Sequence, residues 1–269
     1  MTSVMKEGGA PWICSLVLVA ALAAAGTAHG ADLTVREVTQ ALVDASPERP
    51  ADFAHKDLSF LDLSGLDFKG ADLAGANLYG ADLSDANLSH ARLAGATLDH
   101  TIIVRTDFAG ADLSRASLYA PGAYTGMEAT PAEAPNFAGA DLAGIRIMAR
   151  LSRANMRGAN LAGARLGMAR DQLKTQTRND LSGCDLTDAD LSGADLKEVN
   201  LRFAKLAGAD LSGASLLRAD LSRADLTGAL LTGADLTQAD LDGTILKGVI
   251  GLGQAKGLDQ ALHRDRSVP

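Results

Sequence analysis

Histidine is the residue type in this sequence best suited to acid–base or metal chemistry. Beyond the N-terminal thirty residues the chain has His55, His90, His100 and His263. No two of them are separated by a multiple of twenty residues, the interval at which equivalent positions recur in the coil derived below. We therefore expect the four side chains to lie apart, and the sequence predicts neither a metal site nor a histidine-based catalytic centre.

The sequence also lacks the patterns that nucleophilic or cofactor chemistry needs. It contains no nucleophile motif, no phosphate-binding loop and no cysteine–histidine cluster. Cys184 occupies a repeat position that is otherwise filled by alanine, which favours a buried structural thiol over a reactive one. The sequence therefore predicts a protein that is not an enzyme and that binds no cofactor.

Aspartate and asparagine recur at intervals of twenty residues. The clearest line comprises Asp180, Asn200, Asp220 and Asp240. Asp52 and Asp72 begin a second line, which Arg92 interrupts. The favoured explanation is that these side chains bond the backbone of nearby turns and keep the surface soluble. Two alternatives stay open, a carboxylate line presented to a DNA-binding protein and a weak Ca²⁺ site.

A basic segment interrupts an otherwise acidic chain. Residues 51–118 contain ten acidic and five basic residues and residues 179–246 contain twelve and five, whereas residues 119–178 contain four and eight. The basic set consists of Arg146, Arg150, Arg153, Arg157, Arg165, Arg170, Lys174 and Arg178. It is either a solvated face or a binding site for an anionic partner, such as an acidic polymer or a headgroup. Arg150 and Arg170 would lie in one line if the twenty-residue interval continues there.

A five-residue repeat must position all of these side chains. Ala71-Asp72-Leu73-Ala74-Gly75 shows its formula, and thirty-five such pentads have a large apolar residue at the centre, leucine in twenty-eight of them. Five residues rotate an α-helix by about 500°, so successive leucines would not form a stripe. On a flat strand they would alternate between faces. A chain that turns a corner in every pentad directs all leucines to one axis, and four pentads then close one coil.

The inward positions of this coil define the predicted core. The residue two before each centre is nearly always alanine, and a larger side chain there would overfill a narrow interior. The predicted core leucines include Leu73, Leu78, Leu83, Leu88, Leu191, Leu196, Leu211, Leu221 and Leu236. The frequent glycines fall where a tight corner needs permissive dihedral angles.

The A-(D/N)-L-x-x formula resembles the repeat of the pentapeptide-repeat family and covers most of residues 51–246. The resemblance implies an all-β fold, a right-handed quadrilateral parallel β-helix, with short capping helices. In relatives whose termini pair, the C-terminal segment mediates dimerisation, so a homodimer is one assembly that the resemblance suggests. The handedness comes from the resemblance and not from the spacing.

The ends and interruptions of the repeat predict the domain organisation. Residues 31–50 should cap the N-terminal end, with a helix that starts at the capping-box pattern of Thr34 and Glu37. Blocks of β-helix should occupy 51–118, 137–178 and 179–250, with a loop insertion at 119–136. One residue is missing between Ile147 and Leu151, and residues 167–180 either stay in the coil or loop out. Residues 251–269 should form a cap or tail, in which Leu252, Ala255, Leu258 and Leu262 make a weak amphipathic pattern.

The first thirty residues predict export. Lys6 precedes an apolar run from Trp12 to Ala25, which is followed by small residues. This pattern is typical of a signal peptide cleaved after Ala28 or Gly30, and the run is too short for a comfortable membrane span. We therefore expect a periplasmic or secreted protein with no stable membrane span after cleavage.

Two functions fit these observations. The first is an exported scaffold or protein-interaction module whose partner the sequence does not identify. The second resembles the quinolone-protection members of the family, which mimic DNA and bind type II topoisomerase. The export signal and the basic interruption favour the first. The net charge of −8 argues against direct nucleic-acid binding.

Overall fold

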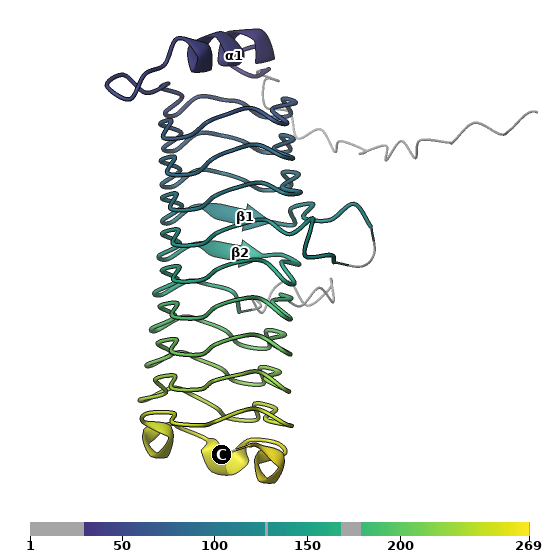
Figure 1. Cartoon of the computed structure of the whole chain (residues 1–269), viewed down its shortest axis with the longest axis vertical. Coiled ribbons are helices and arrows are strands. Elements are labelled where there is room, and N and C mark those ends of the chain that lie inside the picture. The colour runs from purple at the N-terminus through teal and green to yellow at the C-terminus, as the bar shows by residue number, and fades with distance from the viewer. Residues whose placement is uncertain (1–29, 127–128, 168–178, 269) are drawn as a thin grey trace, which may run out of the picture.

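The chain forms a rod of stacked coils, shown in the computed structural model of Figure 1. The structure describes residues 30–126, 129–167 and 179–268. Helix α1 (Val35–Val43) closes one end, and the 3₁₀ helices η2 (Leu252–Gln254), η3 (Leu258–Gln260) and η4 (Arg264–Arg266) lie at the other. Among the described residues, no helix has both the length and the apolar character needed to cross a membrane.

Parallel backbone bridges connect each coil to the next. They form four ladders, which we name A to D after the first residues in each, Asp52, Asp57, Asp62 and Asp67. Each of these residues pairs with the residue twenty positions further on, for example Asp52 with Asp72. On ladder B one pairing is long enough to form two strands, β1 (Ser117–Tyr119) and β2 (Arg146–Met148). One pentad therefore supplies one side of a coil, and four pentads complete it.

The core consists of leucine and alanine that point into the rod. All nine leucines named above are at most 1% exposed, and the alanines two positions before the centres are buried as well. Threonine replaces alanine at some of these positions, and its hydroxyl bonds the backbone inside the rod. Thr106 and Thr244 each donate a hydroxyl hydrogen bond of 2.8 Å to the carbonyl of a leucine in the preceding coil.

The corners between ladders require left-handed backbone. The second residue after most centres has φ between about 55° and 72°, which glycine adopts without a Cβ penalty. Three rings at this position, those of His55, Phe60 and His90, lie over a glycine of the next coil. A Cβ on Gly80 would come within 2.8 Å of the Phe60 ring, so glycine at this position makes room for the aromatic side chain.

The first insertion starts later than the sequence predicted. Gly122 pairs with Ile102 at the usual interval of twenty residues, and Ala123 is 3% exposed at the centre position. The boundary at 118 and the loop at 119–136 were therefore wrong. The coil contains one more pentad, whose centre is Ala123 instead of a leucine, and this pentad was not recognised in the sequence. The ladder then resumes with Asp107 paired to Asn136, twenty-nine residues further on. The extra residues after Tyr124 project from the side of the rod (Figure 1).

The coils after this insertion depart from the twenty-residue interval twice. Asn136 pairs with Asn155 after nineteen residues, which accommodates the residue missing between Ile147 and Leu151. Arg150 then pairs with Asp180 after thirty residues, ten more than the usual interval, and we call the segment between Leu166 and Asn179 the second insertion. The condition for a line of Arg150 and Arg170 is therefore not met, because the ladder partner of Arg150 is Asp180, thirty residues further on; Arg170 itself lies outside the described residues.

The two ends are capped differently. In α1, Thr34 and Glu37 form the predicted capping box, with the Thr34 backbone N–H donating to the Glu37 carboxylate over 2.8 Å. At the C-terminus the ladders continue to Val268, so residues 251–268, where the sequence predicted a cap or tail, form a last, wider coil of 3₁₀ turns that closes the rod. Leu252, Ala255 and Leu258 pack against the core, whereas Leu262 lies on ladder C and is 48% exposed. Three of the four residues in the predicted amphipathic pattern therefore face the core, and Leu262 does not.

Candidate interaction surface

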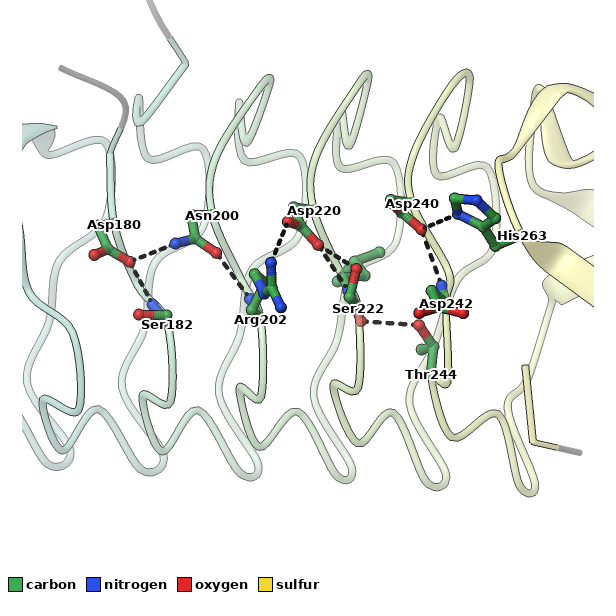
Figure 2. A network of polar contacts seen from close by, with 11 residues as sticks. Asp180, Ser182, Asn200, Arg202, Asp220, Ser222, Asp240, Asp242, Thr244 and His263 are labelled. Atoms are coloured by element: carbon green, nitrogen blue, oxygen red, sulfur yellow. Dashed lines mark hydrogen bonds and ion pairs between the residues drawn. The ribbon is translucent and has the colours of Figure 1, made fainter. Parts of the chain in front are cut away.

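The aspartates of the ladders hold the turns together. Figure 2 shows the line on ladder C. The Asp180 carboxylate accepts the backbone N–H of Ser182 over 3.0 Å, and the Asn200 amide donates to Asp180 over 2.9 Å. Asp220 and Asp240 accept from the residues two positions further on in the same way. One carboxylate oxygen of each aspartate is therefore committed to local backbone, which is the structural role that the sequence favoured.

The histidines lie apart. His55, His90 and His100 follow centres on ladders A, D and B, so they occupy three different corners. His263 contacts Asp240 over 2.8 Å in the last coil. Within the described part of the chain, no three histidine, cysteine, aspartate or glutamate side chains are grouped closely enough to hold a metal ion.

Cys184 lies in the core beneath ladder D. Its thiol is fully buried and donates to the Leu151 carbonyl over 3.0 Å. Burial disfavours the thiolate and raises the pKa of Cys184 to about 12. The side chain fills an alanine position and has no access to a substrate.

The basic side chains do not form one surface. Arg146 and Arg165 are neighbours on ladder B, and Arg150 lies on ladder C. Arg153 occupies the corner between ladders C and D, and Arg157 forms an ion pair with Asp188 over 3.2 Å. The remaining members of the predicted set, Arg170, Lys174 and Arg178, lie outside the described residues. The described members of the predicted partner-binding set are thus distributed over several sides of the rod.

The two insertions border the same side of the rod. Gly122 and Arg150 lie on ladder C in successive coils, because along the chain each comes after a ladder B residue and before a ladder D residue. Asp180 is the ladder C residue of the next coil and pairs with Arg150. The first insertion leaves the coil after Tyr124, at the corner beyond ladder C. The second returns to it at Asn179, at the corner before ladder C. Both insertions therefore flank the stretch of ladder C that contains Arg150.

Polar contacts join the first insertion to this stretch. The Tyr124 hydroxyl donates to the Ser152 carbonyl, and the Ser152 hydroxyl donates to Asp180 over 2.8 Å. Burial raises the pKa of Tyr124, and the nearby Asp180 carboxylate acts in the same direction, whereas the positive charges of Arg150 and Arg153 act in the opposite direction. We define Tyr124, Arg150, Ser152, Arg153 and Asp180 as the Arg150 surface.

The base of the first insertion is held by Glu133. Its backbone carbonyl accepts the Arg105 N–H over 2.9 Å, and its carboxylate accepts hydrogen bonds from the Thr125 and Thr130 hydroxyls. These bonds lower the pKa of Glu133, so its carboxylate stays ionised. The described residues of the insertion are therefore attached to the rod at both ends.

Sequence reasoning missed three features of this rod. Phe60, Tyr79, His100 and Tyr119 stack at one corner. At another corner, the guanidinium groups of Arg202 and Arg223 each lie over the Phe203 ring. Asn179 is buried beside the second insertion. The spacing of 19 to 21 residues between the four rings was the available signal for the first feature.

The chain belongs to the pentapeptide-repeat family. The family model for pentapeptide repeats matches residues 51–89, 91–119, 136–170, 180–216 and 209–248, which together are more than half of the chain. This confirms the resemblance, and family membership implies a right-handed β-helix. Members are generally non-catalytic structural or interaction modules.

Solved structures of the family resemble this rod to different degrees. HetL, a pentapeptide repeat protein involved in heterocyst differentiation regulation in the cyanobacterium Nostoc sp. strain PCC 7120, is 31% identical. The match covers 88% of this chain and all of HetL, with a TM-score of 0.63. A pentapeptide repeat protein of the Arabidopsis thaliana thylakoid lumen is 26% identical over 48% of this chain and 77% of its own, with a TM-score of 0.26. No curated protein sequence matches the chain.

QnrB1, a plasmid-mediated fluoroquinolone resistance protein, is a more distant structural neighbour. It is 20% identical over 69% of this chain and 88% of its own, with a TM-score of 0.29. At this level the likeness concerns the fold alone.

Proposed function

We propose that this protein is an exported protein-interaction scaffold without catalytic activity, and that the Arg150 surface contacts its partner. The observation that carries the proposal is that both insertions border one stretch of ladder C. Loops positioned by a rigid framework are where binding residues concentrate. The similarity to HetL, a protein that acts in regulation, supports a role in interaction.

The composition of the Arg150 surface indicates the character of the partner. Arg150 and Arg153 are exposed, and Tyr124 is partly exposed. Arginine and tyrosine are enriched among the residues that dominate binding energy at protein interfaces. With Asp180 as the acidic neighbour, the surface suits a protein that presents carboxylates beside an apolar group.

Replacing Arg150 and Arg153 together by serine should weaken partner capture at least about tenfold, because it removes two guanidinium groups from the centre of the interface. The measurement is quantitative cross-linking in the native host, followed by mass spectrometry of the captured proteins. The matched control replaces Arg146 and Arg165 by serine, which removes the same charge from ladder B. An equal loss in both double variants, or in neither, would refute the assignment of the Arg150 surface.

The export part of the proposal predicts where the protein is found. Cell fractionation combined with N-terminal sequencing should recover a chain that starts at His29 or Ala31 outside the cytoplasm. A cytoplasmic protein that starts at Met1 would contradict export. It would favour the alternative of a DNA mimic that binds topoisomerase.

A further inference from the structure

Four aromatic side chains occupy the corner between ladders B and C in successive coils. We call Phe60, Tyr79, His100 and Tyr119 the aromatic corner; β1 ends at its last member (Figure 1). The ring centroids of consecutive members are 5.4, 5.2 and 5.5 Å apart. The first and last pairs pack edge to face, with interplanar angles of 68°.

The aromatic corner is rigid and open to solvent. The backbone N–H groups of Phe60 and His100 donate to the carbonyls of Tyr79 and Tyr119 over 2.9 and 2.7 Å. The Phe60 side chain is nevertheless 70% exposed and that of Tyr79 38%, and Ile102 beside them is 41% exposed. Mutual ring contacts stabilise the stack, but they leave its outer side uncovered. A contiguous exposed apolar patch of this kind marks a binding surface.

The repeat distance of the rings restricts what can cover all four. An extended strand presents side chains on one face about every 6.8 Å, and a polyproline helix completes a turn in about 9.3 Å, so both lose register after one or two rings. An α-helix advances about 5.4 Å per turn. Its apolar stripe at i, i+4, i+7 and i+11 therefore places one side chain beside each ring, and three turns span the aromatic corner.

The charges beside the rings favour a basic helix. Asp57 and Asp99 lie toward ladder B, and Asp62 and Asp82 lie on ladder C. None of the four corner positions carries lysine or arginine, so the corner lacks the cations that bind a nucleic-acid backbone. Carboxylates on both flanks also repel an anionic membrane surface.

We propose that the aromatic corner binds an amphipathic α-helix of a partner protein, with an apolar stripe against the rings and lysine or arginine on both flanks of that stripe. This goes beyond the proposed function, because it names a second surface and the chemistry of its ligand. It does not require Arg150, and the two surfaces can therefore be tested separately.

The test uses the full chain and a fluorescent synthetic peptide of about twenty residues, long enough to be helical in water. The peptide carries leucine at i, i+4, i+7 and i+11 with flanking lysines, and binding is followed by fluorescence anisotropy. Replacing Phe60 and Tyr79 together by serine should weaken binding at least tenfold. Phe203→Ser is the matched control, because Phe203 is a 49% exposed ring at a different corner. It should bind like the unaltered protein.

Two further arms decide between ligands. A peptide of identical composition with the stripe scrambled should bind at least tenfold more weakly, and vesicles of phosphatidylcholine and phosphatidylglycerol should not bind. Equal binding of both peptides, or unchanged binding to the Phe60→Ser/Tyr79→Ser variant, would overturn the proposal. So would vesicle binding that is lost in that variant, which would assign the corner to lipid. The Arg150→Ser/Arg153→Ser variant should bind the peptide as the unaltered protein does. The peptide assay therefore tests the aromatic corner, and partner capture tests the Arg150 surface, independently of each other.

Discussion

Replacing Leu211 by aspartate should cost more than about 4 kcal/mol of the free energy of unfolding, because it places a carboxyl group among leucines with no partner. Leu211 is fully buried, and Leu191 and Leu231 occupy the equivalent centres of the coils on either side. The carboxyl group must either stay charged in an apolar interior or take up a proton, and both are unfavourable. Neighbouring coils should open with it, because each coil is stabilised by the next. Thermal melting followed by circular dichroism measures the effect.

The same substitution at Leu230 provides the control. Leu230 lies on ladder A, where it pairs with Asp210 and Ile250, and it occupies the outward position that aspartate holds in most pentads. Leu230→Asp should therefore change the free energy of unfolding by less than about 0.5 kcal/mol. If both variants melt at the temperature of the unaltered protein, the centres do not point into the core. If both lose stability equally, burial is not the reason for the loss at Leu211.

The spacing of the centres was sufficient to predict the coil. A period of five excludes both an α-helix and a flat strand, so a chain that turns in every pentad was the remaining solution. The same reasoning placed alanine and leucine inside and aspartate outside. It also aligned Asp180 with Asn200, Asp220 and Asp240, which the structure pairs in one ladder.

The interruptions could not be placed by spacing alone. Ala123 continues the coil with a side chain too small to be recognised as a centre, so the first insertion seemed to begin at 119. Arg150 and Arg170 satisfied the twenty-residue interval, but the interval applies only where no residues leave the coil. A repeat predicts contacts within a continuous segment and gives no register across an insertion.

The aromatic corner was hidden for a different reason. Tyr79 and Tyr119 follow their centres by one residue, whereas Phe60 and His100 follow theirs by two. Rings therefore come from two different positions of the repeat in alternate coils. Consecutive rings are 19 or 21 residues apart, so a search at intervals of twenty residues does not connect them. The corner is wide enough that rings from both positions meet.

Asn179 was also overlooked, although it stabilises the most irregular part of the rod. It occupies an alanine position directly after the second insertion and is 2% exposed. Its side-chain oxygen accepts the Ala149 N–H over 2.6 Å, and its amide donates to the carbonyls of Ile147 and Leu166. Those three backbone groups lie where the nineteen-residue coil and the insertion disturb the ladders. One side chain thus replaces the backbone partners that the regular coil would supply.

Replacing Asn179 by alanine should therefore cost roughly 3 to 5 kcal/mol, since one buried N–H and two buried carbonyls lose their partner together. Asn200→Ala is the matched control, because Asn200 bonds Asp180 and Arg202 on ladder C at the surface of the rod, and it should cost about 1 kcal/mol. Thermal melting gives the overall loss. Hydrogen exchange should show faster exchange of the Ala149 amide in Asn179→Ala alone, while the amide of Leu211, several coils away, keeps its protection. Equal melting of the two variants with an unchanged Ala149 amide would show that the backbone around the second insertion is held without Asn179.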